Sequence, residues 1–110
     1  VSPSGRWFVF GSMDDSLDKK PTGGLHVLSL DGQVRQLFDG LVVANGIAWT
    51  NEGSAICFSD SARGLLLKAA WDESSGTIGR PLLLATLDEA QGRPDGACVD
   101  AADCYWSAGV

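Results

Sequence analysis

The feature that most constrains the fold of this chain is an internal repeat of about 50 residues. Strand-like runs that carry aromatic side chains recur near Phe8, Phe58 and Trp106, and each follows a turn of Ser, Asn, Asp or Gly. Wherever the chain continues, two further strand-like runs follow before the pattern starts again. Four short antiparallel strands in about 40 to 50 residues are typical of a β-propeller blade. The chain is therefore predicted to be all-β and to form part of a propeller.

The segments between the aromatic runs fit the remaining strands of each blade. Residues 24–38 alternate apolar and polar side chains around Asp31-Gly32, which predicts a hairpin. Residues 64–72 fit a helix or a strand by periodicity, but the turn signal at residues 73–76 favours a strand, and residues 81–87 are predicted to be its outer partner. The predicted division is residues 1–44 as the last three strands of one blade, 45–93 as one complete blade and 94–110 as the first two strands of the next.

Composition limits the classes of partner. Apolar residues make up 45% of the chain, enough for a core, and the net charge of −6 is spread along it. This balance argues against nucleic acid and against an anionic membrane, and favours a small molecule or a cation. The three cysteines are an odd number without a C-x-x-C spacing, which indicates buried apolar residues rather than disulfides or a zinc site.

No apolar run approaches the roughly 18 residues of a membrane-spanning helix. The chain starts without an initiator Met and stops directly after an apolar run, so we expect an internal piece of a longer protein. The expected location of that protein is the cytoplasm.

Two dipeptides at the same point of successive repeats are the strongest functional candidates. Asn45-Gly46 and Asp95-Gly96 lie about 50 positions apart, each before a short apolar run. The first strand of every blade lines the channel of a propeller, so these side chains are predicted to meet at the channel mouth and to share a metal ion. Their oxygens suit calcium, magnesium or manganese, or zinc if a second carboxylate joins. The alternative is a purely conformational role, as in the hairpin at Asp31-Gly32.

Other polar residues fit structural roles better than catalytic ones. His26 lies in an alternating strand without a partner at ligand spacing. Asp60 and Asp100 follow apolar strand residues and are expected to bond to turn amides. Ser61 lacks the Gly-x-Ser-x-Gly context of a serine hydrolase. Three tryptophans are expected to pack between blades: Trp49, Trp71 and Trp106.

Several motifs together resemble one known family. In order along the chain these are Gly5-Arg6-Trp7, Gly11-Ser12-Met13, Asp31-Gly32, Asn45-Gly46-Ile47-Ala48-Trp49, Phe58-Ser59-Asp60-Ser61, Gly92-Arg93-Pro94-Asp95-Gly96-Ala97, Val99-Asp100-Ala101 and Tyr105-Trp106-Ser107-Ala108. This order is similar to that of the gluconolactonase, regucalcin (senescence marker protein) and luciferin-regenerating enzyme family, over essentially the whole chain.

The resemblance implies a six-bladed propeller that hydrolyses sugar lactones with one divalent ion, Ca²⁺, Zn²⁺, Mg²⁺ or Mn²⁺. It assigns Asn45 and Asp95 as metal ligands, and places the third ligand, a Glu, and an Arg and Asn that hold the substrate outside this chain. From the chemistry of such a site, Asp95 is also expected to be the base that accepts the proton of a metal-bound water. Asp14 or Asp15 is the residue expected to face the substrate. The isolated piece is therefore expected to be inactive. The alternatives are a propeller that binds calcium or a ligand without turnover, and a hydrolase of a different lactone or ester.

Overall fold

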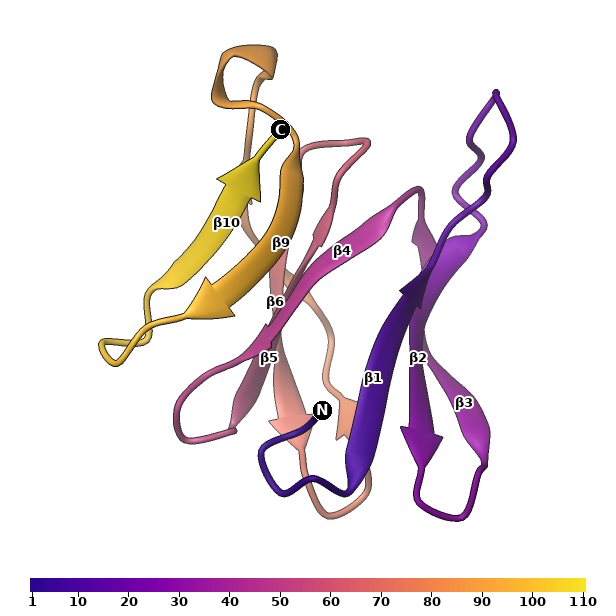
Figure 1. Ribbon diagram of the computed structural model, residues 1–110, viewed down its shortest axis with the longest axis vertical. Helices are drawn as coiled ribbons and strands as arrows, with labels where there is room; N and C mark the ends of the chain where they lie inside the picture. Colours follow the sequence, from indigo (N-terminus) through magenta and orange to yellow (C-terminus); the bar gives the residue numbers. More distant parts are fainter.

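The computed structural model describes residues 1–110 and is built from β-strands. Ten strands and one short 3₁₀ helix follow one another along the chain (Figure 1). Their bounds are β1 Trp7–Ser12, β2 Gly23–Ser29, β3 Val34–Leu41, β4 Ala44–Trp49, β5 Ala55–Asp60, β6 Leu65–Asp72, β7 Thr77–Ile78, β8 Leu82–Thr86, the 3₁₀ helix Glu89–Gln91, β9 Pro94–Val99 and β10 Tyr105–Gly109. The structure has no helix long and apolar enough to span a membrane.

The strands form three antiparallel sheets that follow one another in sequence and lie side by side (Figure 1). The first has the order β1-β2-β3 and the last consists of β9 and β10. In the middle sheet, β4, β5 and β6 pair in turn, and both β7 and β8 pair with β6. The segment 64–72 is thus a strand, and the 81–87 segment supplies its outer partner, as the turn signals predict.

The core lies between the first and the middle sheets. Phe58 and Ile56 on β5 are completely buried and pack in one cluster with Leu25 and Val27 of β2. Phe38 on β3 reaches Phe58 with 5.8 Å between ring centroids. Every residue of β5 is buried, because sheet neighbours flank this strand and the first sheet packs against it. This strand therefore anchors the turn that follows it, at residues 61–64.

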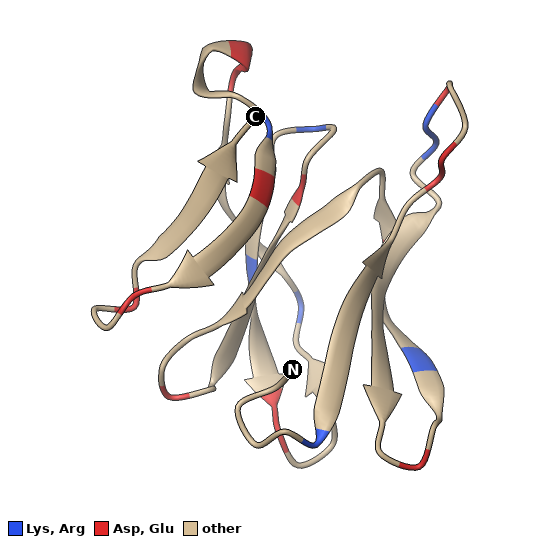
Figure 2. Cartoon of the chain, viewed as in Figure 1, with Lys and Arg blue, Asp and Glu red and all other residues tan.

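The turn at Asp31-Gly32 joins β2 and β3 in a hairpin, as predicted, through a loop of three residues. Gly32 adopts a left-handed conformation with φ 84°, which a glycine adopts without a steric cost. The amide of Gly32 donates to the carbonyl of Ser29, and the amide of Ser29 donates to Gln33, so three residues form the loop rather than a two-residue turn. Charged residues lie mostly in such loops and turns, while the strands are largely uncharged (Figure 2).

Within this chain, burial agrees with expectation for Cys57, Trp49 and Trp71 and differs for Cys98, Cys104 and Trp106. Cys57 is buried, but Cys98 and Cys104 are exposed, because β9 and β10 form a sheet of only two strands. Trp49 and Trp71 pack edge to face with 5.6 Å between centroids, at the core between sheets. Trp106 instead is 59% exposed, and its indole nitrogen donates to Asp100 within its own hairpin.

Candidate functional site

Asn45 lies inside β4, directly before an irregularity in the strand. Asn45 pairs with Ser59 on β5 and Ala48 pairs with Cys57, so two residues of β4 face the single Phe58 between them. This is a β-bulge, a feature that redirects neighbouring side chains. Gly46 adopts the left-handed conformation with φ 60° at this point. The sequence pattern predicts Asn45 directly before its strand, whereas in the structure it is the second residue of β4, next to the bulge.

Asp95 is beside a second bulge, in the neighbouring sheet. Pro94 pairs with Gly109 and Ala97 with Ser107, so Asp95 and Gly96 on β9 together face Ala108 on β10. Both candidate residues are therefore on the first strand of a sheet and next to an irregularity of register. The repeat in sequence thus corresponds to a bulge in each strand, although Gly46 has a left-handed backbone and Gly96 does not.

The two candidate side chains are in direct contact. Asn45 Nδ2 donates a hydrogen bond to Asp95 Oδ1 at 2.5 Å, and Asn45 Oδ1 accepts from the amide of Gly46 at 2.9 Å. Both residues are half-buried, and Asp95 Oδ2 makes no hydrogen bond within the protein. The contact joins the middle sheet to the β9–β10 sheet. A carboxylate and an amide thus meet at the seam between two sheets, as the repeat predicts.

Tyr105 on β10 reaches across the same seam. Its hydroxyl donates to the carbonyl oxygen of Gly46 at 2.6 Å. Burial raises the pKa of Tyr105 to about 12, so the hydroxyl stays protonated and remains a donor at neutral pH. A Cβ on Gly46 would overlap the Tyr105 hydroxyl, and would lie 2.9 Å from Ser59 Oγ and 3.0 Å from Asp95 O. The bulge at Gly46 therefore has room for a hydrogen atom only.

Asp60, at the end of β5, organises the chain that enters β4. Its carboxylate is completely buried and accepts from the amides of Val42 at 2.8 Å and Val43 at 3.2 Å. It also accepts from the amide of Ala62 and pairs with the guanidinium of Arg63 at 2.6 Å. The expectation that Asp60 bonds to turn amides is confirmed, and its partners include residues immediately before Asn45.

The chemistry of the Asn45–Asp95 pair fits a hard divalent cation in part. One carboxylate and one amide oxygen are the ligand types that calcium and magnesium prefer. The chain has no group of three or more His, Cys, Asp or Glu side chains placed to hold a metal ion. At this seam, the oxygens of Asn45 and Asp95 are the candidate donors.

Asp14 and Asp15 begin the loop that follows β1. This loop starts near Asn45, because Met13 forms an isolated antiparallel bridge with Val43. The Asp14 carboxylate, however, accepts from the amides of Ser16 at 2.9 Å and Lys20 at 3.3 Å. The hydrogen bonds from Ser16, followed by that from the Lys20 amide, lower the pKa of Asp14. The structure thus turns Asp14 toward its own loop and leaves Asp15 exposed without a contact to the pair.

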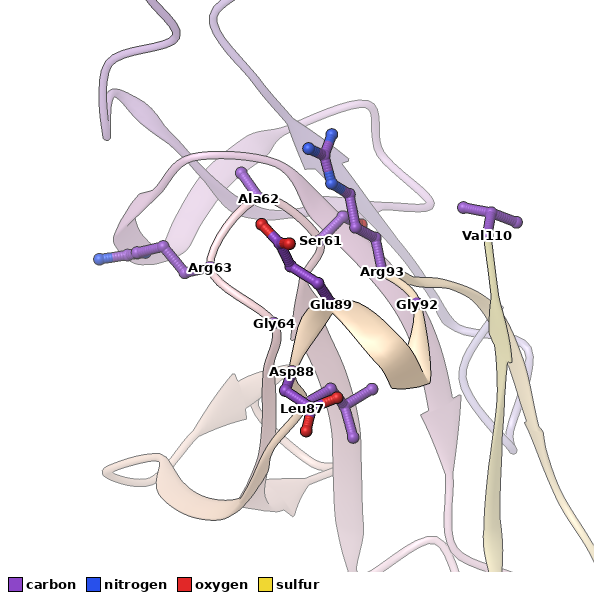
Figure 3. Close-up of a pocket in the computed structure, with 10 residues that line it drawn as sticks. All are labelled: Ser61, Ala62, Arg63, Gly64, Leu87, Asp88, Glu89, Gly92, Arg93 and Val110. Carbon is purple, nitrogen blue, oxygen red and sulfur yellow. The ribbon is translucent and has the colours of Figure 1, made fainter.

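A cavity of about 560 Å³ lies beside this site (Figure 3). It is lined by the turn between β5 and β6, by the connection between β8 and β9, and by Val110. Neither Asn45 nor Asp95 lines it, but Ser61 does, and the Ser61 hydroxyl donates to the carbonyl of Pro94 at 2.5 Å. Arg93, two residues before Asp95, also lines the cavity.

The remaining candidates have structural roles. His26 Nε2 lies 2.8 Å from Ser12 Oγ on the adjacent strand, and its ring stacks on Phe10. Sequence reasoning missed Tyr105 and both bulges. No local pattern signals them, because the reach of Tyr105 to Gly46 depends on how two sheets are placed against each other. The Tyr105-Trp106 dipeptide by itself indicates only a strand.

Comparison with known proteins agrees with this architecture. The family model described as the SMP-30/Gluconolactonase/LRE-like region matches residues 1–110. The chain belongs to this family. A solved luciferin-regenerating enzyme superposes with a TM-score of 0.84 and 26% identity, over 96% of this chain and 36% of that one. A solved calcium-binding protein, regucalcin from Agrobacterium tumefaciens, has a TM-score of 0.85 at 22% identity, over 96% of this chain and 35% of that one, which supports the fold alone.

Among curated relatives, 6-deoxy-6-sulfogluconolactonase of Pseudomonas putida is 34% identical over 98% of this chain and 36% of its own length. The chain therefore spans little more than a third of this relative. Members of the family named lactonases place the chain among relatives that include sugar-lactone hydrolases.

Proposed function

We propose that the full-length protein containing this chain is a divalent-metal-dependent sugar-lactone hydrolase, with Asn45 and Asp95 as two of the metal ligands. The observation that carries the proposal is the contact of 2.5 Å between these side chains across the seam of two sheets. Membership of the gluconolactonase family supports the class of substrate. Further ligands and the residues that hold the substrate come from the rest of the protein.

The proposed architecture is a six-bladed propeller. Residues 1–44 form the last three strands of one blade, residues 45–93 a complete blade and residues 94–110 the first two strands of the next. Three successive antiparallel sheets, each with its own hairpins, support this division. Asn45 and Asp95 then belong to the innermost strands of adjacent blades, and their contact lies at the mouth of the channel.

A divalent ion held by Asn45 and Asp95 would supply Lewis acidity toward a lactone carbonyl and a water molecule. Asp95 would act as a metal ligand and as a proton acceptor, and its two carboxylate oxygens can divide these roles. Oδ1 faces Asn45, while Oδ2 has no protein partner and accepts the proton of the attacking water. With this proton removed, the water oxygen would bond to the carbonyl carbon and the ring C–O bond would break. The proton held at Oδ2 would then pass to the departing ring oxygen, which gives the hydroxy acid.

Asn45 contributes an oxygen without a negative charge. An all-carboxylate site would neutralise the cation more fully and weaken its polarising effect on the carbonyl. The Gly46 amide holds Asn45 Oδ1 at 2.9 Å and fixes the plane of the carboxamide. The half-buried position of both side chains excludes part of the surrounding water, which strengthens their electrostatic interaction with an ion.

The test is hydrolysis of a panel of sugar lactones by the full-length protein with Ca²⁺, Mg²⁺, Mn²⁺ or Zn²⁺ after removal of metal by EDTA. We expect Asp95→Asn to lower kcat/KM at least about 100-fold, because the negative charge of the ligand and the proton acceptor are both lost. Asp31→Asn is the matched control, since Asp31 precedes a glycine in a plain hairpin turn. It should leave kcat/KM within about twofold of wild type.

Near-wild-type hydrolysis by Asp95→Asn contradicts the assignment of Asp95. Tight Ca²⁺ binding without hydrolysis of any lactone or ester in the panel favours instead a propeller that binds calcium without turnover. Hydrolysis of esters but not of sugar lactones would support the proposed mechanism, with an ester instead of a sugar lactone as the substrate.

A further inference from the structure

Ser61 is the first residue after β5, and it contacts the chain before both candidate ligands. Its backbone amide donates to the carbonyl of Val43 at 2.9 Å, two residues before Asn45. Its hydroxyl donates to the carbonyl of Pro94 at 2.5 Å, one residue before Asp95. One residue thus bridges the entries of β4 and β9, which belong to different sheets.

The support beneath Ser61 is rigid. It directly follows Asp60, which is completely buried and accepts from two backbone amides before Asn45. Asp60 also accepts from the guanidinium of Arg63, which in turn donates to the carbonyl of Gly40. β5 itself is buried along its whole length. A displacement of Ser61 relative to the entry of β4 would therefore break several buried hydrogen bonds, and such displacements are costly.

We propose that Ser61 is a positioning residue that sets the separation between Asn45 and Asp95. Its amide fixes the backbone that leads to Asn45, and its hydroxyl fixes the backbone that leads to Asp95. Loss of the hydroxyl frees the entry of β9 and leaves the β4 side unchanged. The two side chains then sample a wider range of separations, which weakens the binding of a cation that needs both. The inference rests on the proposed metal site.

Although Ser61 lines a cavity, the surroundings of its hydroxyl do not fit a nucleophile. Ser61 lines the cavity of about 560 Å³ (Figure 3). Its hydroxyl donates to the carbonyl of Pro94. No base lies within hydrogen-bond distance of the Ser61 hydroxyl, whose acceptor is the carbonyl of Pro94. The serine therefore acts through Asp95 and not on the substrate.

The test compares Ca²⁺ affinity in metal-free, full-length variants by isothermal titration calorimetry. We expect Ser61→Ala to weaken Ca²⁺ binding about tenfold or more, the usual scale for partners that hold metal ligands in place. Ser61→Thr keeps the hydroxyl and should restore affinity to within about threefold of wild type. The matched control is Ser29→Ala, because the amide and hydroxyl of Ser29 also donate to a carbonyl, that of Gln33, in a hairpin away from the site.

A reduced Ca²⁺ affinity also predicts that excess Ca²⁺ restores part of the lactone kcat/KM of Ser61→Ala, which a general loss of folding would not allow. The inference is overturned if Ser61→Ala binds Ca²⁺ like wild type while Asn45→Ala binds weakly, and the proposed metal site then stands. It is also overturned if Ser61→Thr is as weak as Ser61→Ala. If Asn45→Ala itself binds Ca²⁺ like wild type, the proposed metal site fails and the positioning role fails with it.

Discussion

The bulge at Gly46 gives the sharpest quantitative prediction. Replacement of Gly46 by Ala places a Cβ at a residue with φ 60°, which costs about 1 to 2 kcal/mol for an L-residue in the left-handed region. The new methyl group also overlaps the Tyr105 hydroxyl and lies 2.9 Å from Ser59 Oγ. Overpacking of this kind costs about 1 to 3 kcal/mol. We therefore expect Gly46→Ala to lower the free energy of unfolding by about 2 to 5 kcal/mol.

The overlap with Tyr105 can be isolated by a double-mutant cycle. Tyr105→Phe alone removes the hydrogen bond to the Gly46 carbonyl and should cost about 1 to 3 kcal/mol, since a buried acceptor loses its donor. In the double variant the phenolic oxygen is absent, so part of the overlap with the new methyl group disappears. The two costs should therefore sum to about 1 to 2 kcal/mol more than the cost of the double variant, within the range for residues in contact.

Urea unfolding of the full-length protein, followed by tryptophan fluorescence, measures the four free energies. Additivity to within about 0.3 kcal/mol, which is typical of independent sites, would refute the packing argument. Because Gly46 is adjacent to Asn45, we expect Gly46→Ala to weaken Ca²⁺ binding as well. If Gly46→Ala binds Ca²⁺ with wild-type affinity, the bulge does not contribute to the metal site.

Two further predictions concern stability. Because burial raises the pKa of Tyr105 from about 10 to about 12, the unfolded chain loses this proton first as pH rises. The free energy of unfolding should therefore fall between about pH 10 and about pH 12 more steeply for wild type than for Tyr105→Phe, as measured by urea midpoints. Equal pH dependence of the two proteins would contradict the burial of Tyr105. Phe58→Ala should cost about 3 to 5 kcal/mol, because the side chain is completely buried. Leu30→Ala, at a hairpin tip where Leu30 is 82% exposed, should change stability by less than about 0.5 kcal/mol in the same assay.

The sequence predicts the strands because their signals are local. Alternation and the Asp31-Gly32 turn define the hairpin between β2 and β3, and the repeat predicts that Asn45 and Asp95 meet. The role of these two residues as metal ligands remains a prediction. The bulges could not be predicted, because a change of register depends on the partner strand as well as on its own residues. The contacts of Tyr105 with Gly46 and of Ser61 with Pro94 were missed for a similar reason.

Asp14 lies in a loop close to the site, but its carboxylate makes no hydrogen bond to Asn45 or Asp95. The loop after β1 does lie next to the entry of β4 through the bridge of Met13 with Val43. The Asp14 carboxylate is nevertheless occupied by the amides of its own loop. Side-chain direction within an irregular loop depends on turns that a pattern of residue types does not define.

The position of the Asn45–Asp95 contact has a consequence for the stability of the whole chain. The two residues are 50 positions apart in sequence and belong to different sheets. An ion held by both would act as a cross-link that closes a loop of this length. For a permanent cross-link, a loop of about 50 residues corresponds to about 4 kcal/mol of chain entropy removed from the unfolded state. Ion binding would therefore contribute to holding adjacent sheets together, and removal of the ion would loosen the fold first at this seam.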